Sequence, residues 1–151
     1  MTGTDSGPTV DIVVPGATAP KSKQVIVMAL AVAVCMAAAI WSSSQSLMTL
    51  FADARSHLTI SRRLVDGPNQ GVVQLGTVWL PLPHLLLVPT VLVKSWWQSG
   101  WAAIPLNAVC LALQAVSVFR IAAQRWSTRV AWMCTAVLLS LIHISEPTRP
   151  Y

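Results

Sequence analysis

Long apolar runs separated by short polar stretches outline the chain. Residues 24–41 form a near-continuous apolar run, about long enough to cross a bilayer as a helix. A second run covers residues 101–119, and a third apolar stretch starts at residue 130. The pattern predicts an all-α integral membrane protein, a multi-span helical bundle with spans at 24–41 and 101–119 and the start of another at 130–139.

The segment after the first span has a different period. Its apolar residues recur at helical spacing and form one stripe: Leu47, Phe51, Ala54, Leu58 and Val65. Asp53 and His57 are four residues apart and share another face of that helix, while Arg55, Arg62 and Asp66 fall on a third. We expect an amphipathic juxtamembrane helix on the outer face of the membrane, within an outer loop at residues 42–81.

Prolines shape the next segment. Residues 71–79 are predicted to be extended or irregular, and Pro81 and Pro83 disfavour helical backbone at the residues before them. The apolar run at 82–93 is short for a span. We predict that it is a re-entrant or surface segment, with a full crossing left open. Residues 94–100 are predicted to be a turn with interfacial tryptophans.

Composition agrees with a membrane protein and excludes other classes. Of the 151 residues 54% are hydrophobic and 10% charged, whereas about a quarter of the residues in a soluble domain are charged. The net charge of +5 comes without any Lys/Arg-rich run, so we expect no nucleic acid partner. Cys35, Cys110 and Cys134 lie in apolar segments without metal-ligand spacing, and we interpret them as small buried hydrophobes.

The basic residues predict an orientation. Lys21 and Lys23 precede the first span and place the N-terminus in the cytoplasm, with residues 1–23 as a disordered cytoplasmic tail. Three arginines follow the second span. They also face the cytoplasm if residues 82–93 do not cross the membrane, which is the arrangement we prefer.

The acids are concentrated in one place. Asp53 and Asp66 are the only acids between residues 12 and 145. A carboxylate just outside a membrane can take a proton from an acceptor hydroxyl, or hold a metal near a donor phosphate. The alternative is a solvated loop acid paired with Arg55 or His57. Asp66 precedes Gly67 and Pro68 and is assigned a structural role in a turn.

Two stretches carry a family resemblance. The segment Asp53-Ala-Arg-Ser-His-Leu-Thr-Ile-Ser-Arg62 resembles the first outer-loop signature of GT-C membrane glycosyltransferases, which include protein-mannosyltransferase-like and aminoarabinose-transferase-like enzymes. Trp79-Leu-Pro-Leu-Pro-His84 resembles the Pro-Pro-Leu stretch of that family. Ala54 stands where an acid is common in the family, and His57 replaces Tyr.

The resemblance implies a function and a set of site residues. It implies a bacterial plasma-membrane enzyme that transfers a sugar from a polyprenyl-phosphate donor to an acceptor on the outer face. Asp53 would be the catalytic base or would hold a divalent metal. The residues that would bind substrate are His57, Arg62, Arg63, Trp79 and His84. For the two arginines, the alternative is a solvated pair that faces lipid headgroups.

The end of the chain has a different character. Ser140-Leu-Ile-His-Ile-Ser-Glu-Pro-Thr-Arg-Pro-Tyr151 resembles translated read-through of a sequencing adapter. We therefore expect residues 140–151 to be non-native and residues 24–139 to be the N-terminal fragment of a longer enzyme, inactive alone. Two alternatives stay open: a non-catalytic multi-helix membrane protein that binds lipid or a partner, and a transporter fragment.

Overall fold

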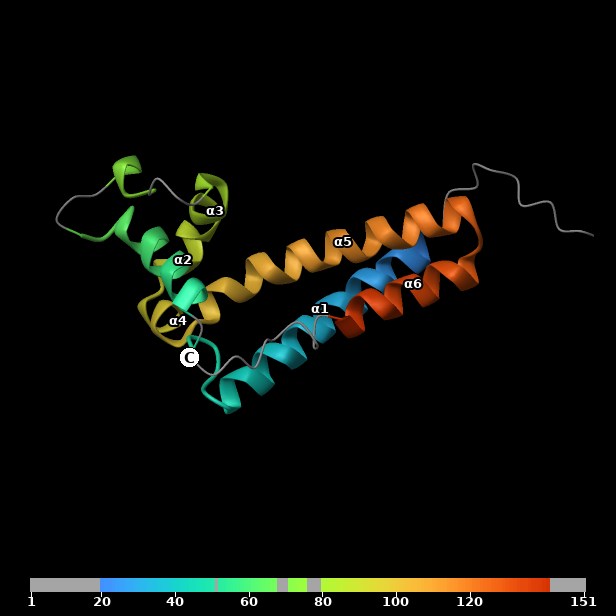
Figure 1. Ribbon diagram of the computed structural model, residues 1–151, viewed down its shortest axis with the longest axis horizontal. Helices are drawn as coiled ribbons and strands as arrows, with labels where there is room; N and C mark the ends of the chain where they lie inside the picture. Colours follow the sequence, from blue (N-terminus) through green and yellow to red (C-terminus); the bar gives the residue numbers. More distant parts are fainter. Residues whose placement is uncertain (1–19, 51, 68–70, 76–79, 142–151) are drawn as a thin grey trace, which may run out of the picture.

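The structure is a computed structural model that describes residues 20–50, 52–67, 71–75 and 80–141. Regular structure in these residues is entirely helical. The six α-helices are α1 (Lys21–Ser44), α2 (Ala52–Arg63), α3 (Pro81–Val91), α4 (Lys94–Ser99), α5 (Ile104–Arg125) and α6 (Thr128–Leu141), and the two 3₁₀ turns are η1 (Val72–Leu75) and η2 (Trp101–Ala103). Helices α1, α5 and α6 form a bundle, and α2, α3 and α4 gather at one end of it (Figure 1).

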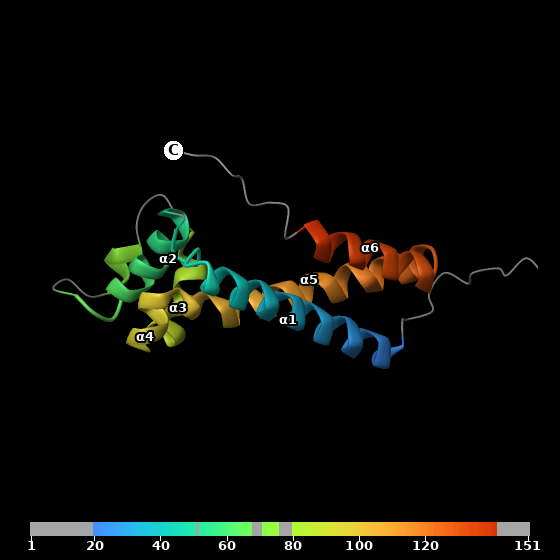
Figure 2. The same cartoon turned by 90° about the horizontal axis from the view of Figure 1, so that it is seen from below.

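Small side chains let the bundle helices approach closely. Helix α1 runs antiparallel to α5, and α6 folds back along α5 (Figures 1 and 2). The bundle core is rich in alanine and contains Val27, Ala31, Leu111, Ala112, Ala115, Phe119, Ala122 and Ala131. Alanine-rich contacts are typical of helices that pack within membranes. Phe119 also meets Trp132 of α6 edge-to-face, with ring centroids 5.0 Å apart.

Two helices are long and apolar enough to cross a membrane: α1, and α5 extended by η2 to Trp101–Arg125. Only 17% and 28% of the residues in their apolar windows are buried. A soluble core helix of such composition would be buried on most sides, so the exposed apolar surface favours a lipid environment. Both segments predicted as spans are therefore helices of spanning length, extended beyond the predicted limits.

The helix ends are divided between the two ends of the bundle. The N-terminus of α1 and the connection between α5 and α6 lie at the same end of the bundle, opposite α2, α3 and α4 (Figures 1 and 2). Lys21 therefore lies at the same end as Arg125 and Arg129. Helix α3 has 11 residues, about 16 Å, and packs on α2 outside the bundle. The non-crossing of residues 82–93 stays a prediction.

The predicted amphipathic helix is present, but it is shorter than the apolar stripe from Leu47 to Val65. Helix α2 covers Ala52–Arg63, and residues 47–50 form turns after α1. Its stripe residue Leu58 is buried with Leu87, Val91 and Ala102. Phe51 lies outside the described residues. Arg62 and Asp66, which were predicted to share a face with Arg55, form an ion pair.

Two local predictions are wrong. Leu82 is helical because Pro81 starts α3 and Pro83 follows in the first turn, where backbone N–H groups have no intrahelical acceptor and proline costs nothing. Residues 94–99 form helix α4 instead of a turn. Gly100, with φ of 86°, ends that helix in the left-handed conformation that glycine adopts without strain.

The second apolar helix continues past its predicted limit at residue 119. Arg120 and Arg125 lie within α5, and the chain reverses at residues 126–127. Alanine and glutamine are strong helix formers, which accounts for the extra turn and a half of α5. The suspected tail enters the described residues only at Ser140 and Leu141, which continue α6. Residues 142–151 lie outside them.

Candidate functional site

Two of the predicted site residues meet at the junction of α2 and α3. His57 Nδ1 lies 2.9 Å from His84 Nε2, and the rings stack with centroids 4.9 Å apart. His84 Nδ1 lies 3.0 Å from the carbonyl oxygen of Leu80. A carbonyl only accepts, so His84 carries its proton on Nδ1 and its Nε2 accepts from His57. His84 is fully buried. In this geometry its imidazole is neutral and connects α3 to His57 of α2.

Burial governs the charge state of His84. Desolvation lowers the pKa of His84 below its ordinary value of 6.5, and the nearby His57 lowers it further, against an opposing effect of the Leu80 hydrogen bond. The folded state therefore binds a proton at lower pH than the unfolded state does. The stabilising contribution of neutral His84 is complete above pH 6.5 and is lost as the pH falls below it.

The expected result of acidification is a loosened α2–α3 contact. Between pH 8 and pH 5, backbone amides of α3 should lose protection from hydrogen exchange after correction for the intrinsic rate, because protonation charges a buried imidazole. The amides of α6, which holds no histidine within Thr128–Leu141, serve as the internal control. A His84→Gln variant should show no such pH dependence. Equal loss of protection in α3 and α6 would contradict the assignment to His84.

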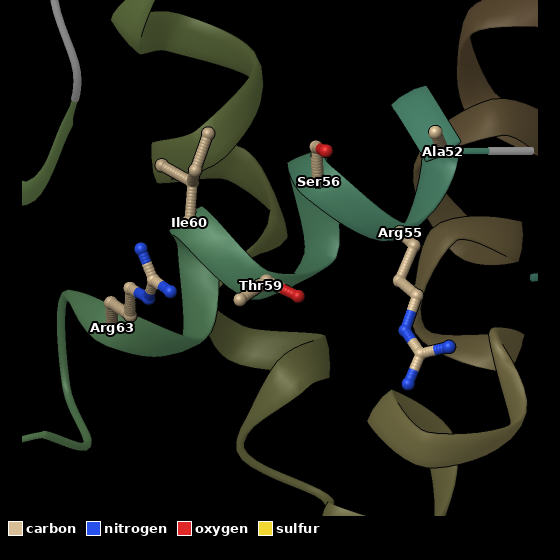
Figure 3. Close-up of a pocket in the computed structure, with 6 residues that line it drawn as sticks. All are labelled: Ala52, Arg55, Ser56, Thr59, Ile60 and Arg63. Carbon is tan, nitrogen blue, oxygen red and sulfur yellow. The ribbon is translucent and has the colours of Figure 1, made fainter.

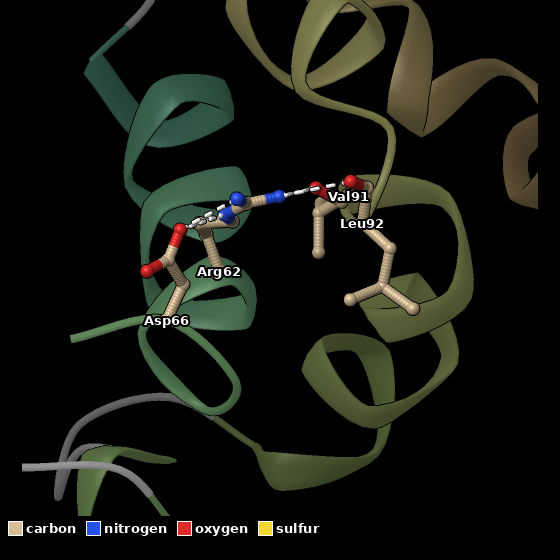
Figure 4. Close-up of polar contacts among 4 residues, drawn as sticks. All are labelled: Arg62, Asp66, Val91 and Leu92. Carbon is tan, nitrogen blue, oxygen red and sulfur yellow. Dashed lines mark hydrogen bonds and ion pairs between the residues drawn. The ribbon is translucent and has the colours of Figure 1, made fainter.

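Arg62 fastens α2 to the C-terminal end of α3 (Figure 4). Its Nη1 donates to the carbonyl oxygens of Val91, at 2.6 Å, and Leu92, at 3.1 Å. Its Nε donates to Asp66 at 2.9 Å, and its guanidinium lies over the ring of Trp97, 5.7 Å from the centroid. The carbonyls at a helix C-terminus favour a cation. These contacts occupy Arg62 within the protein, and its predicted role in binding lipid phosphate stays untested.

A partly enclosed hollow in the described part of the chain is formed by three segments. It has a volume of about 320 Å³ and is lined by Thr49, Arg55, Leu58, Thr59, Trp97 and Gln98. Thr49 comes from the turns after α1, Trp97 and Gln98 come from α4, and the others from α2. Gly100 permits this approach, since a Cβ there would come within 3.0 Å of Met48 and 3.1 Å of Thr49. We call this the three-segment hollow.

A second, more open groove follows the exposed face of α2 alone (Figure 3). Arg55 and Arg63 lie toward its two ends, with Ser56 and Thr59 between them. The two arginines are eight residues apart, about 12 Å along the helix axis. Arg55 also lines the three-segment hollow, whereas Arg63 does not.

Asp53 lies apart from these contacts. It is exposed in the first turn of α2, where a carboxylate interacts favourably with the helix dipole. It forms no hydrogen bond or ion pair with the described residues. These residues also contain no group of three potential His, Cys, Asp or Glu ligands, so a metal at Asp53 would need ligands from elsewhere. Trp79 lies outside the described residues.

Sequence reasoning missed most of the three-segment hollow. Thr49 and Gln98 were not considered, and Trp97 was interpreted as an interfacial tryptophan. Arg55 was considered as a partner for Asp53 and as part of a helix face with Arg62 and Asp66. The run Trp96-Trp97-Gln98 was the one available signal, because it places an apolar ring next to an amide that can hydrogen-bond a hydroxyl. Contacts between segments more than 40 residues apart have no signature in one sequence.

Comparison of the chain with known protein families, curated proteins and solved structures finds no match. The site is therefore interpreted from its own geometry. It comprises an arginine, two threonine hydroxyls, an amide and an indole around one hollow, at the end of the bundle opposite the clustered Lys21 and Arg125. Such a set can bind an anionic group that carries hydroxyls.

Proposed function

We propose that this chain is the N-terminal part of a GT-C-like membrane glycosyltransferase, and that the three-segment hollow receives the phosphate-linked sugar of a polyprenyl-phosphate donor on the outer face of the membrane. The single observation that supports this most is the convergence of Arg55, Thr49 and Gln98 beside Trp97. The resemblance of the Asp53 and Pro81 stretches to that family supplies the reaction class.

The chemistry of the hollow suits such a donor. A guanidinium forms paired hydrogen bonds with phosphate oxygens, and Arg55 is exposed. Thr49, Thr59 and Gln98 offer donors and acceptors to sugar hydroxyls, while Trp97 gives an apolar ring face. Helix α3 presents Leu82, Leu85 and Leu86 outward, and this apolar surface suits contact with a polyprenyl chain.

Substitution of Arg55 tests the binding step. Arg55→Gln is expected to weaken binding of polyprenyl phosphate by about 10-fold or more, since hydrogen bonds to charged groups contribute about 1.5–3 kcal/mol. Native mass spectrometry of the purified chain in detergent micelles, titrated with polyprenyl phosphate, measures the affinity.

Arg63→Gln is the matched control for this experiment. It removes the same charge from the same face of α2 but lies outside the three-segment hollow. We expect its affinity to stay within about 3-fold of the original, as exposed charges contribute little. An equal loss in both variants would mean that only the overall charge of α2 attracts the lipid, and the proposed hollow would be wrong.

A non-catalytic lipid-binding protein is the second candidate. The exposure of Asp53, and its lack of contacts with other described residues, favours this alternative, because a catalytic base is usually oriented by neighbours. The two candidates share the Arg55 result and differ in sugar transfer. Only the glycosyltransferase proposal requires that Asp53 affect a reaction rate.

A further inference from the structure

The exposed side of α5 carries a regular polar seam. Its residues are spaced alternately by three and four positions: Asn107, Cys110, Gln114, Ser117, Ile121 and Gln124. All are exposed except Gln124, which is half-buried. The buried residues of α5, such as Ala115 and Phe119, lie on the other side, against α1 and α6. The spacing is that of positions a and d in a heptad, the seam along which two helices pack.

Lipid is a poor neighbour for this seam. Asn107 and Gln114 form no side-chain hydrogen bond with the described part of the chain, and Gln114 lies near the middle of the candidate span Trp101–Arg125. An amide without a partner in hydrocarbon costs several kcal/mol. Ser117 differs, because its hydroxyl donates to the Leu113 carbonyl oxygen at 2.7 Å. The two amides therefore need hydrogen-bonding groups from another helix.

The seam also contains a hollow that could accept a side chain from a second helix. Ser117, Arg120, Ile121 and Gln124 line a cavity of about 240 Å³ on the surface of α5. These residues have the i, i+3, i+4, i+7 spacing of a hole that accepts one side chain in knobs-into-holes packing. The hollow continues the seam toward the end of α5. Arg120 flanks the hole, and its long side chain can extend to the membrane surface.

We propose that the α5 seam is the interface of a homodimer, in which α5 of one copy packs in parallel against α5 of a second copy. All copies of a chain insert into a membrane in one orientation, so a two-fold axis along the membrane normal places each seam residue opposite its own counterpart. Amides carry both donors and acceptors, so Asn107 pairs with Asn107 and Gln114 with Gln114 of the second copy. No a or d position of the seam carries a charge. Arg120 and Arg125 flank the seam near the C-terminal end of α5, where their long side chains can extend away from each other to the membrane surface.

Cys110 lies in the seam and provides the test. The full chain, in the membranes of an expression host, is oxidised with copper phenanthroline and run on a non-reducing gel. We expect a disulfide-linked dimer that disappears in Cys110→Ser and persists when Cys35 and Cys134 are both replaced by alanine. Gln114→Leu is expected to reduce the dimer yield by about 3-fold or more, since interhelical hydrogen bonds in membranes favour association by roughly that factor.

The matched control moves the thiol off the seam. Val109 is 57% exposed and adjoins Cys110, yet faces about 100° away around the helix. Val109→Cys in the Cys110→Ser background should not cross-link. Cross-linking at position 109 equal to that at 110 would indicate random collision and overturn the proposal. So would an unchanged yield in Gln114→Leu, or Cys110 cross-linked only to a different membrane protein. This proposal does not depend on the glycosyltransferase function.

Discussion

Replacing Arg62 with alanine is expected to release α3 from α2 and to destabilise that contact by about 2–3 kcal/mol. The guanidinium donates to the Val91 and Leu92 carbonyl oxygens at the end of α3, and each hydrogen bond to a charged group contributes about 1.5–3 kcal/mol. Backbone amides of α2 and α3 should exchange hydrogen about 30- to 150-fold faster, measured by mass spectrometry on the chain in micelles. The amides of α6 should be unaffected.

Two variants separate the parts of the Arg62 contact. Asp66→Asn removes an exposed ion-pair partner, the Asp66 side chain being 61% exposed, and should cost less than about 1 kcal/mol. Arg62→Lys keeps the charge but has no planar fork to reach Asp66 and both carbonyls together, so an intermediate loss is expected. If Asp66→Asn were as harmful as Arg62→Ala, the ion pair and not the α3 carbonyls would hold the helices together.

The effect should extend to the three-segment hollow. Arg62 lies over Trp97, and Trp97 lines that hollow. The arginine therefore helps to hold α4 against α2, although it does not line the hollow itself. A residue that the sequence suggested as a phosphate ligand thus has contacts suited to positioning the binding surface. We infer that Arg62→Ala would lower the affinity for lipid, because Trp97 and α4 would no longer be held against α2.

The helical framework could be predicted because its physical signals are local. Uninterrupted apolar runs marked α1 and α5, and a helical repeat around Leu58 marked α2. The signal failed for α4 and for the start of α3, where the prediction used the rule that a residue before proline avoids helix. Pro81 and Pro83 occupy the first turn of α3, where that restriction matters least. Helix α4 contacts α3 and η2, so tertiary packing contributes to it beside the local end signal of Gly100.

The candidate site could be predicted only in part. The shared helix face of Arg62 and Asp66 follows from their i, i+4 spacing and was expected, whereas their ion pair was not named. The contact of His57 with His84 joins residues 27 positions apart, and the sequence suggested both as substrate ligands without indicating that they touch. Burial of His84 depends on how α3 packs on α2, which no periodicity specifies. The same limit applies to the hollow between Thr49, Arg55 and Gln98.

The proposed glycosyltransferase function requires that Asp53→Asn in the full-length protein lower the rate of sugar transfer, and the expected loss is about 10²- to 10⁴-fold, the usual contribution of a general base. Asparagine has nearly the same shape as aspartate but cannot accept the proton of an acceptor hydroxyl. Donor affinity should stay within about 3-fold, because Asp53 does not line the three-segment hollow. Transfer of labelled sugar from a polyprenyl-phosphate donor measures the rate, and native mass spectrometry measures the affinity.

Asp66→Asn is the matched control, since Asp66 is the other acid of the same loop and is bound to Arg62. It should keep most of the transfer activity. An Asp53→Asn enzyme that still transfers sugar at the original rate would exclude the catalytic role, and with normal donor binding it would favour the non-catalytic lipid-binding protein. A loss of transfer in Asp53→Asn alone, with affinity unchanged, would mean that this carboxylate acts after the donor has bound, as base or as metal ligand, because a lower rate with unchanged binding reports an interaction made in the transition state.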